Sequence, residues 1–139
     1  MSSHADIKNR NLINNLTALR TELYSSRTKN VRILQLTEQI AYDLYAIRFT
    51  NCKSGKDRTS MSCTLEQVRK AGQMFGFNEI NQGKLFQQML DTLRSEGVRR
   101  SNTTKNVGVP KYAFNAIRIM TLPTLYRPPG GTYGNYVQT

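Results

Sequence analysis

Nine consecutive residues set the organisation of this chain, and they read Asn51-Cys52-Lys53-Ser54-Gly55-Lys56-Asp57-Arg58-Thr59. Five residues separate the cysteine from the arginine, which is the spacing of a phosphate-binding catalytic loop. A loop of this length can curl so that successive backbone N–H groups point at one phosphate, and a helix that follows adds the positive end of its dipole. An apolar run precedes the stretch and a helical pattern follows it, so the sequence predicts a strand–loop–helix site.

The residues of this loop divide into a nucleophile, its electrostatic partner and a phosphate cradle. Cys52 is the expected nucleophile, because a helix N-terminus and neighbouring cations can lower a thiol pKa from ~8.5 to roughly 3.5–7.5. Arg58 is expected to grip two phosphate oxygens with its planar fork and to stabilise the transition state. The other expected phosphate-binding residues are Lys53, Ser54, Gly55, Lys56 and Thr59. The alternative for Cys52 is a small buried hydrophobic residue, since this spacing also arises by chance.

Asp57 is the one acid inside the loop, and two roles are open to it. It can protonate the leaving group, although the neighbouring cations Lys56 and Arg58 should lower its carboxyl pKa and weaken it as a proton donor. It can equally orient Arg58. Thr59 lies on the other side of the arginine. It is placed to hydrogen bond the Cys52 thiolate that is released when water hydrolyses a phosphorylated cysteine.

The chain offers too few ligands for a transition-metal site, because His4 is its one histidine. A zinc ion would need carboxylates from distant parts of the sequence, so we expect no metal and no cofactor. Cys63 lies eleven residues after Cys52. It can form a reversible disulfide that protects Cys52, although helix packing is the more common role of such a residue.

The composition is typical of a globular domain, but the charge is not. Of 139 residues, 38% are hydrophobic and 21% charged, so we expect residues 1–139 to form a single domain. Twenty lysines and arginines against nine aspartates and glutamates give a net charge of +11. This charge predicts attraction to anionic membrane faces, inositol phosphates or nucleic acids, and composition alone does not choose among them.

No stretch of the sequence predicts a membrane span or a secretion signal. No apolar run approaches the ~18 residues of a spanning helix, and the first residues lack an apolar signal segment. Cysteines that stay reduced fit the cytosol, where a thiolate nucleophile survives. The sequence therefore predicts a cytoplasmic protein that is soluble or peripherally attached to membranes.

Periodicity predicts a helix-rich chain with one strand. Helices are expected over residues 6–24 and 31–45, from the loop to a stop at Gly72 and Gly76, over 81–95 with a stop at Gly97, and over 111–120. Residues 46–50 are the expected strand, which delivers Cys52 to the loop. Residues 122–139 are too rich in proline and glycine for a regular element.

Two further stretches carry expectations about packing and charge. In the helix over 81–95 the core stripe is expected to consist of Leu85, Met89 and Leu93, widened by Phe86 and Leu90. Residues 98–110 are polar and basic, which favours a solvated loop. The alternative for them is a basic loop beside the phosphate site.

The loop and several motifs downstream resemble the C-terminal catalytic region of the inositol polyphosphate 4-phosphatase family, which consists of cysteine-dependent phosphoinositide phosphatases. The likeness extends from about residue 29 to the C-terminus. Besides the loop it is carried by Thr59-Ser60-Met61-Ser62, Thr64-Leu65-Glu66-Gln67, Arg94-Ser95-Glu96-Gly97, Lys105-Asn106-Val107, Lys111-Tyr112-Ala113-Phe114-Asn115, Tyr126-Arg127-Pro128-Pro129 and Gly131-Thr132-Tyr133-Gly134. The loop is also similar to that of bacterial effector phosphoinositide phosphatases, but the downstream motifs favour the eukaryotic family.

The resemblance implies an α/β, cysteine-phosphatase-like fold, of which this chain is a helix-rich C-terminal part with a strand–P-loop–helix active site. Members of the family are several times longer and carry an N-terminal lipid-binding C2 region that is absent here. The expectation is therefore a partial phosphatase domain, with the other strands of its central sheet supplied from upstream of Met1.

The resemblance also implies hydrolysis of the 4-phosphate of phosphatidylinositol 3,4-bisphosphate through a phosphocysteine intermediate. The implied partners are phosphoinositide headgroups and anionic membrane surfaces, with soluble inositol phosphates as further substrates and no nucleic acid. Lys53 and Lys56 resemble the two lysines of lipid phosphatases that prefer several phosphates, and Asp57 matches the myotubularin-like position of the acid. Two alternatives stay open: a non-catalytic polyanion-binding module, and a protein or broad inositol phosphate phosphatase of the bacterial effector type.

Overall fold

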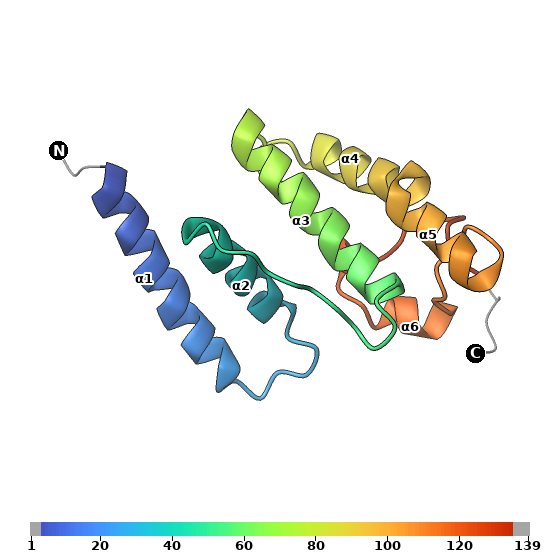
Figure 1. Cartoon of the computed structure of the whole chain (residues 1–139), viewed down its shortest axis with the longest axis horizontal. Helices are drawn as coiled ribbons and strands as arrows, with labels where there is room; N and C mark the ends of the chain where they lie inside the picture. Colours follow the sequence, from blue (N-terminus) through green and yellow to red (C-terminus); the bar gives the residue numbers. More distant parts are fainter. Residues whose placement is uncertain (1–3, 135–139) are drawn as a thin grey trace. The chain divides into compact units, whose positions relative to one another are not determined.

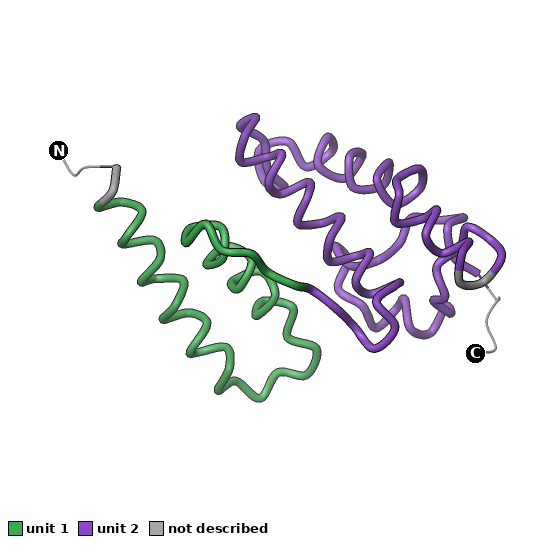
Figure 2. Tube along the Cα trace, viewed as in Figure 1, with its two compact units in different colours: residues 1–49 green, residues 50–139 purple. Residues whose placement is uncertain are grey.

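The computed structural model of the chain describes residues 4–134, and most of the regular structure in that range is helical (Figure 1). The helices are α1 (His4–Leu23), α2 (Val31–Asp43), α3 (Asp57–Phe75), α4 (Gly83–Glu96), α5 (Val98–Val107) and α6 (Ala116–Met120), followed by the 3₁₀ helix η1 (Thr124–Tyr126). The chain divides into two compact units, residues 1–49 and 50–139 (Figure 2). We describe each unit by itself.

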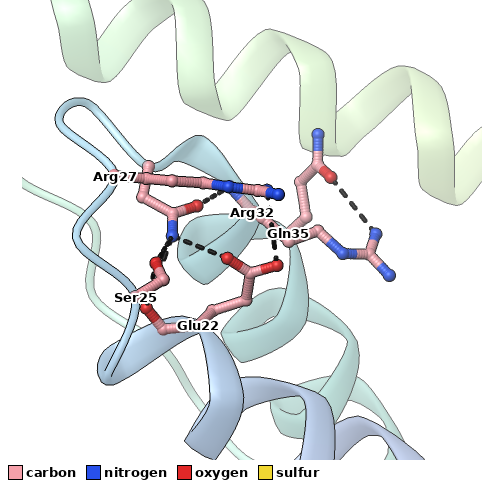
Figure 3. A network of polar contacts seen from close by, with 6 residues as sticks. Glu22, Ser25, Arg27, Arg32 and Gln35 are labelled. Carbon is pink, nitrogen blue, oxygen red and sulfur yellow. Dashed lines mark hydrogen bonds and ion pairs between the residues drawn. The ribbon is translucent and has the colours of Figure 1, made fainter.

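The first unit is a hairpin of α1 and α2, and a network of polar contacts that includes Glu22, Ser25 and Arg27 fixes its turn (Figure 3). The Asn30 side chain accepts from the Arg32 N–H at 3.1 Å, which caps α2, and donates to the Glu22 carboxylate at 2.8 Å. It also donates to the Ser25 hydroxyl at 3.1 Å. Arg27 pairs with the other Glu22 oxygen at 3.7 Å. Because the Asn30 side chain hydrogen bonds groups on both sides of the turn, it fixes the conformation of the turn between α1 and α2.

The second unit is built on α3, which has one apolar face. Met61, Leu65 and Val68 recur at helical spacing and are all buried, and α4 and α5 both pack against this helix. Asp57 stands in its first turn, where a negative charge complements the helix dipole. The helix ends at Gly76, which has a φ of 75° and lies in the left-handed region that favours glycine.

Arg94 of α4 occupies the centre of the second unit and is fully buried, at 0% exposure. Its guanidinium donates to the Thr64 hydroxyl at 3.0 Å and to the Met61 carbonyl at 3.0 Å, which ties α4 to α3. It also donates to the carbonyls of Leu125 at 2.7 Å and Arg127 at 2.8 Å. One buried side chain therefore joins two helices and the C-terminal segment through four charge-assisted hydrogen bonds.

The charge of Arg94 survives its burial. Desolvation lowers the pKa of Arg94 to about 10, while Tyr112, Asp91 and Tyr126 act in the opposite direction. Tyr112 is also fully buried, and its hydroxyl donates to the Arg94 carbonyl at 3.0 Å. At neutral pH Arg94 is thus a cation whose donors meet oxygen acceptors, which is the condition under which a buried charge is tolerated.

The expected strand over residues 46–50 is not formed. These residues have no regular structure, and Ile47 and Phe49 are 86% and 94% exposed. A strand needs a neighbouring strand to satisfy its N–H and C=O groups. Within residues 4–134 the one β-bridge joins Tyr112 to Tyr133, so residues 46–50 have no strand to pair with there. The α/β, cysteine-phosphatase-like fold remains a prediction.

The expected loop over residues 98–110 is wrong in its first ten residues, which form α5. The Arg100 guanidinium explains part of this, because it donates to the carbonyls of Ser95 and Pro110 and so ties both ends of the segment. Conversely, the expected helix over 111–120 is formed only as α6, since the bridge to Tyr133 and the buried Phe114 keep the earlier residues out of it.

Two smaller expectations about helix ends and faces also need correction. Gly72 does not end α3, because the helix continues to Phe75. It instead gives the returning backbone room, since a Cβ on Gly72 would lie 2.3 Å from the Phe77 carbonyl oxygen. In α4 the buried stripe consists of Phe86, Leu90 and Arg94, while Leu85 is exposed. The expected burial of Phe86 and Leu90 is therefore confirmed, but Arg94 rather than Leu85 completes the buried face.

Candidate functional site

The loop after residue 50 turns sharply at Gly55. The Gly55 N–H donates to the Cys52 carbonyl at 3.1 Å, and Gly55 has a φ of 64°. A Cβ at this position would lie 2.9 Å from the Asn51 Oδ1 atom. Both the left-handed backbone and the close approach of Asn51 therefore require glycine. The turn brings the loop directly into α3, which begins at Asp57.

Cys52 lies in an environment that favours its thiolate. Partial burial on its own would raise its pKa, but hydrogen bonds from the Thr59 hydroxyl and from the backbone N–H groups of Thr59, Ser54 and Gly55 stabilise the negative charge. Together these lower the pKa of Cys52 from 9.0 to about 6. At pH 7 thiolate therefore exceeds thiol by about tenfold.

Thr59 makes two different contacts with the cysteine. Its oxygen accepts a hydrogen bond from the Cys52 N–H at 2.9 Å, and its hydroxyl bonds the Cys52 sulfur. Thr59 is itself buried in the first turn of α3. Because the acceptor contact fixes the hydroxyl oxygen, the proton of that hydroxyl is held ready for the thiolate.

Asp57 is buried, and its carboxylate is committed to the backbone. One oxygen accepts a hydrogen bond from the Ala113 N–H at 2.9 Å. This contact links the start of α3 to the segment that precedes α6. Within residues 4–134 the described ion pairs do not include one between Asp57 and Arg58. The structure thus gives Asp57 an anchoring contact that the sequence analysis did not consider.

The structure does not place every expected site residue around the cysteine. Ser54, Gly55 and Thr59 contact Cys52 through the hydrogen bonds described above. Lys53 and Arg58 are exposed, and in the described part of the chain the Arg58 guanidinium has no hydrogen-bond or ion-pair partner. Arg58 belongs to the first turn of α3, so its backbone lies at the loop even though its side chain extends into solvent.

A cavity of about 240 Å³ adjoins the loop. Its walls come from the loop, from the first turns of α3 and from α5, and the lining residues are Ser54, Gly55, Lys56, Ser60, Arg99, Asn102 and Lys105. Residues 98–110 were expected as a solvated loop or, in the alternative, as a basic loop beside the phosphate site; Arg99, Asn102 and Lys105 do lie beside the Cys52 loop, but on helix α5. Their spacing of three would have placed them on one helix face, had residues 98–107 been predicted as a helix.

Cys63 forms no disulfide in the described structure, and no metal-binding cluster is found among the described residues. Cys63 is a partly buried free thiol on α3, and Cys52 is also free, so the described structure contains no disulfide between them. Among residues 4–134 no group of three or more His, Cys, Asp or Glu side chains is placed to hold a metal ion. None of the described helices is long and apolar enough to cross a membrane.

Comparison with protein families gives a match over most of the chain. Residues 3–126 match the family described as the INPP4A C-terminal domain. No solved structure matches the chain.

Similar curated proteins include two phosphatases and one exchange factor. The chain is 45% identical over 119 residues to human inositol polyphosphate 4-phosphatase type II, and equally to the type II inositol 3,4-bisphosphate 4-phosphatase of Pongo abelii. These alignments cover 86% of this chain but 12% of each relative. The human phosphatidylinositol 3,4,5-trisphosphate-dependent Rac exchanger 2 protein is 32% identical over 105 residues, which is 73% of this chain and 6% of that protein.

Proposed function

Because this chain belongs to the family of the INPP4A C-terminal domain, we propose that it carries the catalytic loop of a phosphoinositide phosphatase. The proposed reaction is hydrolysis of the 4-phosphate of phosphatidylinositol 3,4-bisphosphate, with soluble inositol polyphosphates as further substrates. Two relatives that are 45% identical to this chain support the 4-phosphatase activity, since they are named as an inositol polyphosphate 4-phosphatase and an inositol 3,4-bisphosphate 4-phosphatase. The proposed setting is cytoplasmic, at the surface of anionic membranes that attract the charge of +11.

The observation that carries the proposal is the stabilised thiolate of Cys52. Its pKa of about 6 makes a sulfur nucleophile available at neutral pH. In the first step the Cys52 sulfur attacks phosphorus, the bond from phosphorus to the inositol oxygen breaks, and that oxygen takes a proton from Asp57 or, where Asp57 acts as an anchor, from water. In the second step water attacks the phosphocysteine, inorganic phosphate leaves, and the sulfur departs as a thiolate beside the Thr59 hydroxyl.

The side chains around the loop have distinct proposed roles. Arg58 follows the developing charge on the transferred phosphoryl group once substrate draws its exposed guanidinium inward, and Lys53 and Lys56 neutralise further phosphate charge. Asp57 has two competing roles, as proton donor to the inositol oxygen or as an anchor. Its hydrogen bond with the Ala113 N–H supports the anchor.

The second candidate function is binding of phosphoinositides without turnover. The observation in its favour is the similarity to a protein named as a phosphatidylinositol 3,4,5-trisphosphate-dependent Rac exchanger, a name that does not describe a phosphatase. The net charge of +11 would supply affinity for any polyanionic headgroup. A loop that holds phosphate but does not cleave it would need the N–H groups around Cys52 but not its thiolate.

Phosphate release separates the two candidates. The chain is assayed on phosphatidylinositol 3,4-bisphosphate, soluble inositol 3,4-bisphosphate and a phosphotyrosine peptide, beside Cys52→Ser. We expect release from the two inositol compounds and a loss of several powers of ten in the variant, since the nucleophile is gone. A Cys52→Ser chain that keeps more than about a tenth of the activity would rule out covalent catalysis.

A further inference from the structure

The cavity beside the loop shares a wall with the cysteine. Ser54 and Gly55 line the cavity, and their backbone N–H groups also hydrogen bond the Cys52 sulfur. The cavity and the Cys52 sulfur therefore share two residues of the loop. The opposite wall comes from α5, through Arg99, Asn102 and Lys105.

The lining of the cavity carries positive charge and no negative charge. Lys56 comes from the loop, and Arg99 and Lys105 come from α5, whereas no aspartate or glutamate is among the lining residues. The Arg99 Nε atom is buried and, among the described residues, has no hydrogen-bond partner. A buried donor without an acceptor favours a bound oxygen, and three cations favour one that is negatively charged.

The basic residues of α5 do not all serve the same purpose. Arg100 is used by the fold, because its guanidinium donates to the carbonyls of Pro110 and Ser95. Arg99 and Lys105 have no such contacts within residues 4–134, and both line the cavity. Helix α5 is therefore held in place by Arg100, whereas Arg99 and Lys105 line the cavity beside the Cys52 loop.

We propose that this cavity binds the phosphate that is not cleaved, on an inositol ring that carries two phosphate monoesters on neighbouring carbons. The inference rests on the proposed function, which places the cleaved phosphate over Cys52. The size of about 240 Å³ is below the ~300–1,000 Å³ of pockets that enclose a whole small molecule. It suits one phosphate and the adjoining edge of a ring, while the rest of the ligand extends outward to a lipid or to water.

Binding tests the proposal without requiring turnover. Affinities of the chain for inositol 3,4-bisphosphate, inositol 4-phosphate and inorganic phosphate are measured by calorimetry at fixed ionic strength, in a Cys52→Ser background that prevents hydrolysis. The test variant is Arg99→Gln with Lys105→Gln. The matched control is Arg118→Gln with Lys84→Gln, which removes the same charge from exposed residues of α6 and α4 outside the cavity lining. Circular dichroism checks that all chains are equally folded.

The expected result is a selective loss. The test variant should bind inositol 3,4-bisphosphate at least about tenfold more weakly, while inositol 4-phosphate loses less than about threefold and the control variant changes neither. Vesicles with phosphatidylinositol 3,4-bisphosphate, compared with phosphatidylserine vesicles of equal charge, show whether a lipid headgroup obeys the same rule. If the preference for the bisphosphate is absent on vesicles but present for the soluble compounds, the cavity is assigned to the soluble ligand.

Three results would overturn the inference. They are equal losses for the bisphosphate and the monophosphate, an equal loss in the control variant, and no preference of the parent chain for the bisphosphate. The proposed function fails separately, if the chain with Cys52 intact binds inositol 3,4-bisphosphate through Arg99 and Lys105 but releases no phosphate. That outcome would leave the cavity assigned and the catalysis refuted.

Discussion

Arg94 and the pair Arg99 and Lys105 lie within twelve residues of one another, yet they occupy opposite environments. Arg94 is fully buried, and its guanidinium donates hydrogen bonds to four oxygen acceptors of the protein. Arg99 and Lys105 line a cavity, and the buried Nε atom of Arg99 has no hydrogen-bond partner among the described residues. Since all three are cations, the difference lies in their partners: a cation with satisfied donors supports the fold, whereas a cation with open donors is available to an anionic ligand.

The largest effect is expected at Arg94, on stability. Arg94→Ala leaves the Thr64 hydroxyl and three carbonyls without their donor and opens a cavity in the core, so we expect a loss of about 3–5 kcal/mol in the free energy of unfolding. Urea denaturation measures it, with the exposed Arg118→Ala as control. If the two variants unfold at the same urea concentration, the hydrogen bonds of Arg94 do not stabilise the fold.

A smaller effect on stability is expected at Gly55, whose turn shapes the loop that contains Cys52. Gly55→Ala places a side chain at positive φ and 2.9 Å from the Asn51 Oδ1 atom. We expect a loss of about 1–2 kcal/mol in stability, together with slower alkylation of Cys52 because the Gly55 N–H moves away from the sulfur. The matched control is Gly130→Ala, where a Cβ meets nothing within 4 Å. Equal behaviour of both variants would show that the turn tolerates a side chain.

The smallest effect on stability is expected at Asp57. Asp57→Asn keeps an oxygen that can accept from the Ala113 N–H, so its free energy of unfolding should change by less than about 0.5 kcal/mol, whereas Asp57→Ala should lose about 1 kcal/mol with that hydrogen bond. Turnover distinguishes the two roles. An acid predicts that the Asn variant loses much more activity on an inositol headgroup than on a substrate with a good leaving group. Equal losses on both substrates would assign Asp57 to positioning.

These contrasts also show what sequence patterns can and cannot predict here. The turn at Gly55 and the stops at Gly76 and Gly97 depend on local backbone geometry, and the sequence carries them directly. The role of Arg94 depends on acceptors about thirty residues away in both directions, which no local pattern reveals. A charged residue within an apolar stripe is expected to face solvent, so the burial of Arg94 beside Phe86 and Leu90 was not predicted.

Two of the errors of secondary structure show how tertiary context decides whether an element forms. Residues 98–107 are poor in apolar residues, and α5 is stabilised by the contacts of Arg100 and by the buried Thr103 rather than by an apolar stripe. Residues 46–50 have the composition of a strand, but strand formation requires a partner strand. In α5 tertiary contacts outweighed a weak local propensity, whereas residues 46–50 lack the partner strand that their propensity requires.

The central claim is that the loop holds Cys52 as a thiolate, and the pH dependence of its alkylation tests this most directly. The rate of reaction with iodoacetamide is measured from pH 4 to 10 in a Cys63→Ser background, with and without Thr59→Val. Because thiolate is the reactive form, the rate falls as pH drops through the pKa. We predict a midpoint near pH 6 that moves upward in Thr59→Val, which lacks the hydroxyl that bonds the sulfur. A midpoint near 9, unchanged by Thr59→Val, would contradict the account.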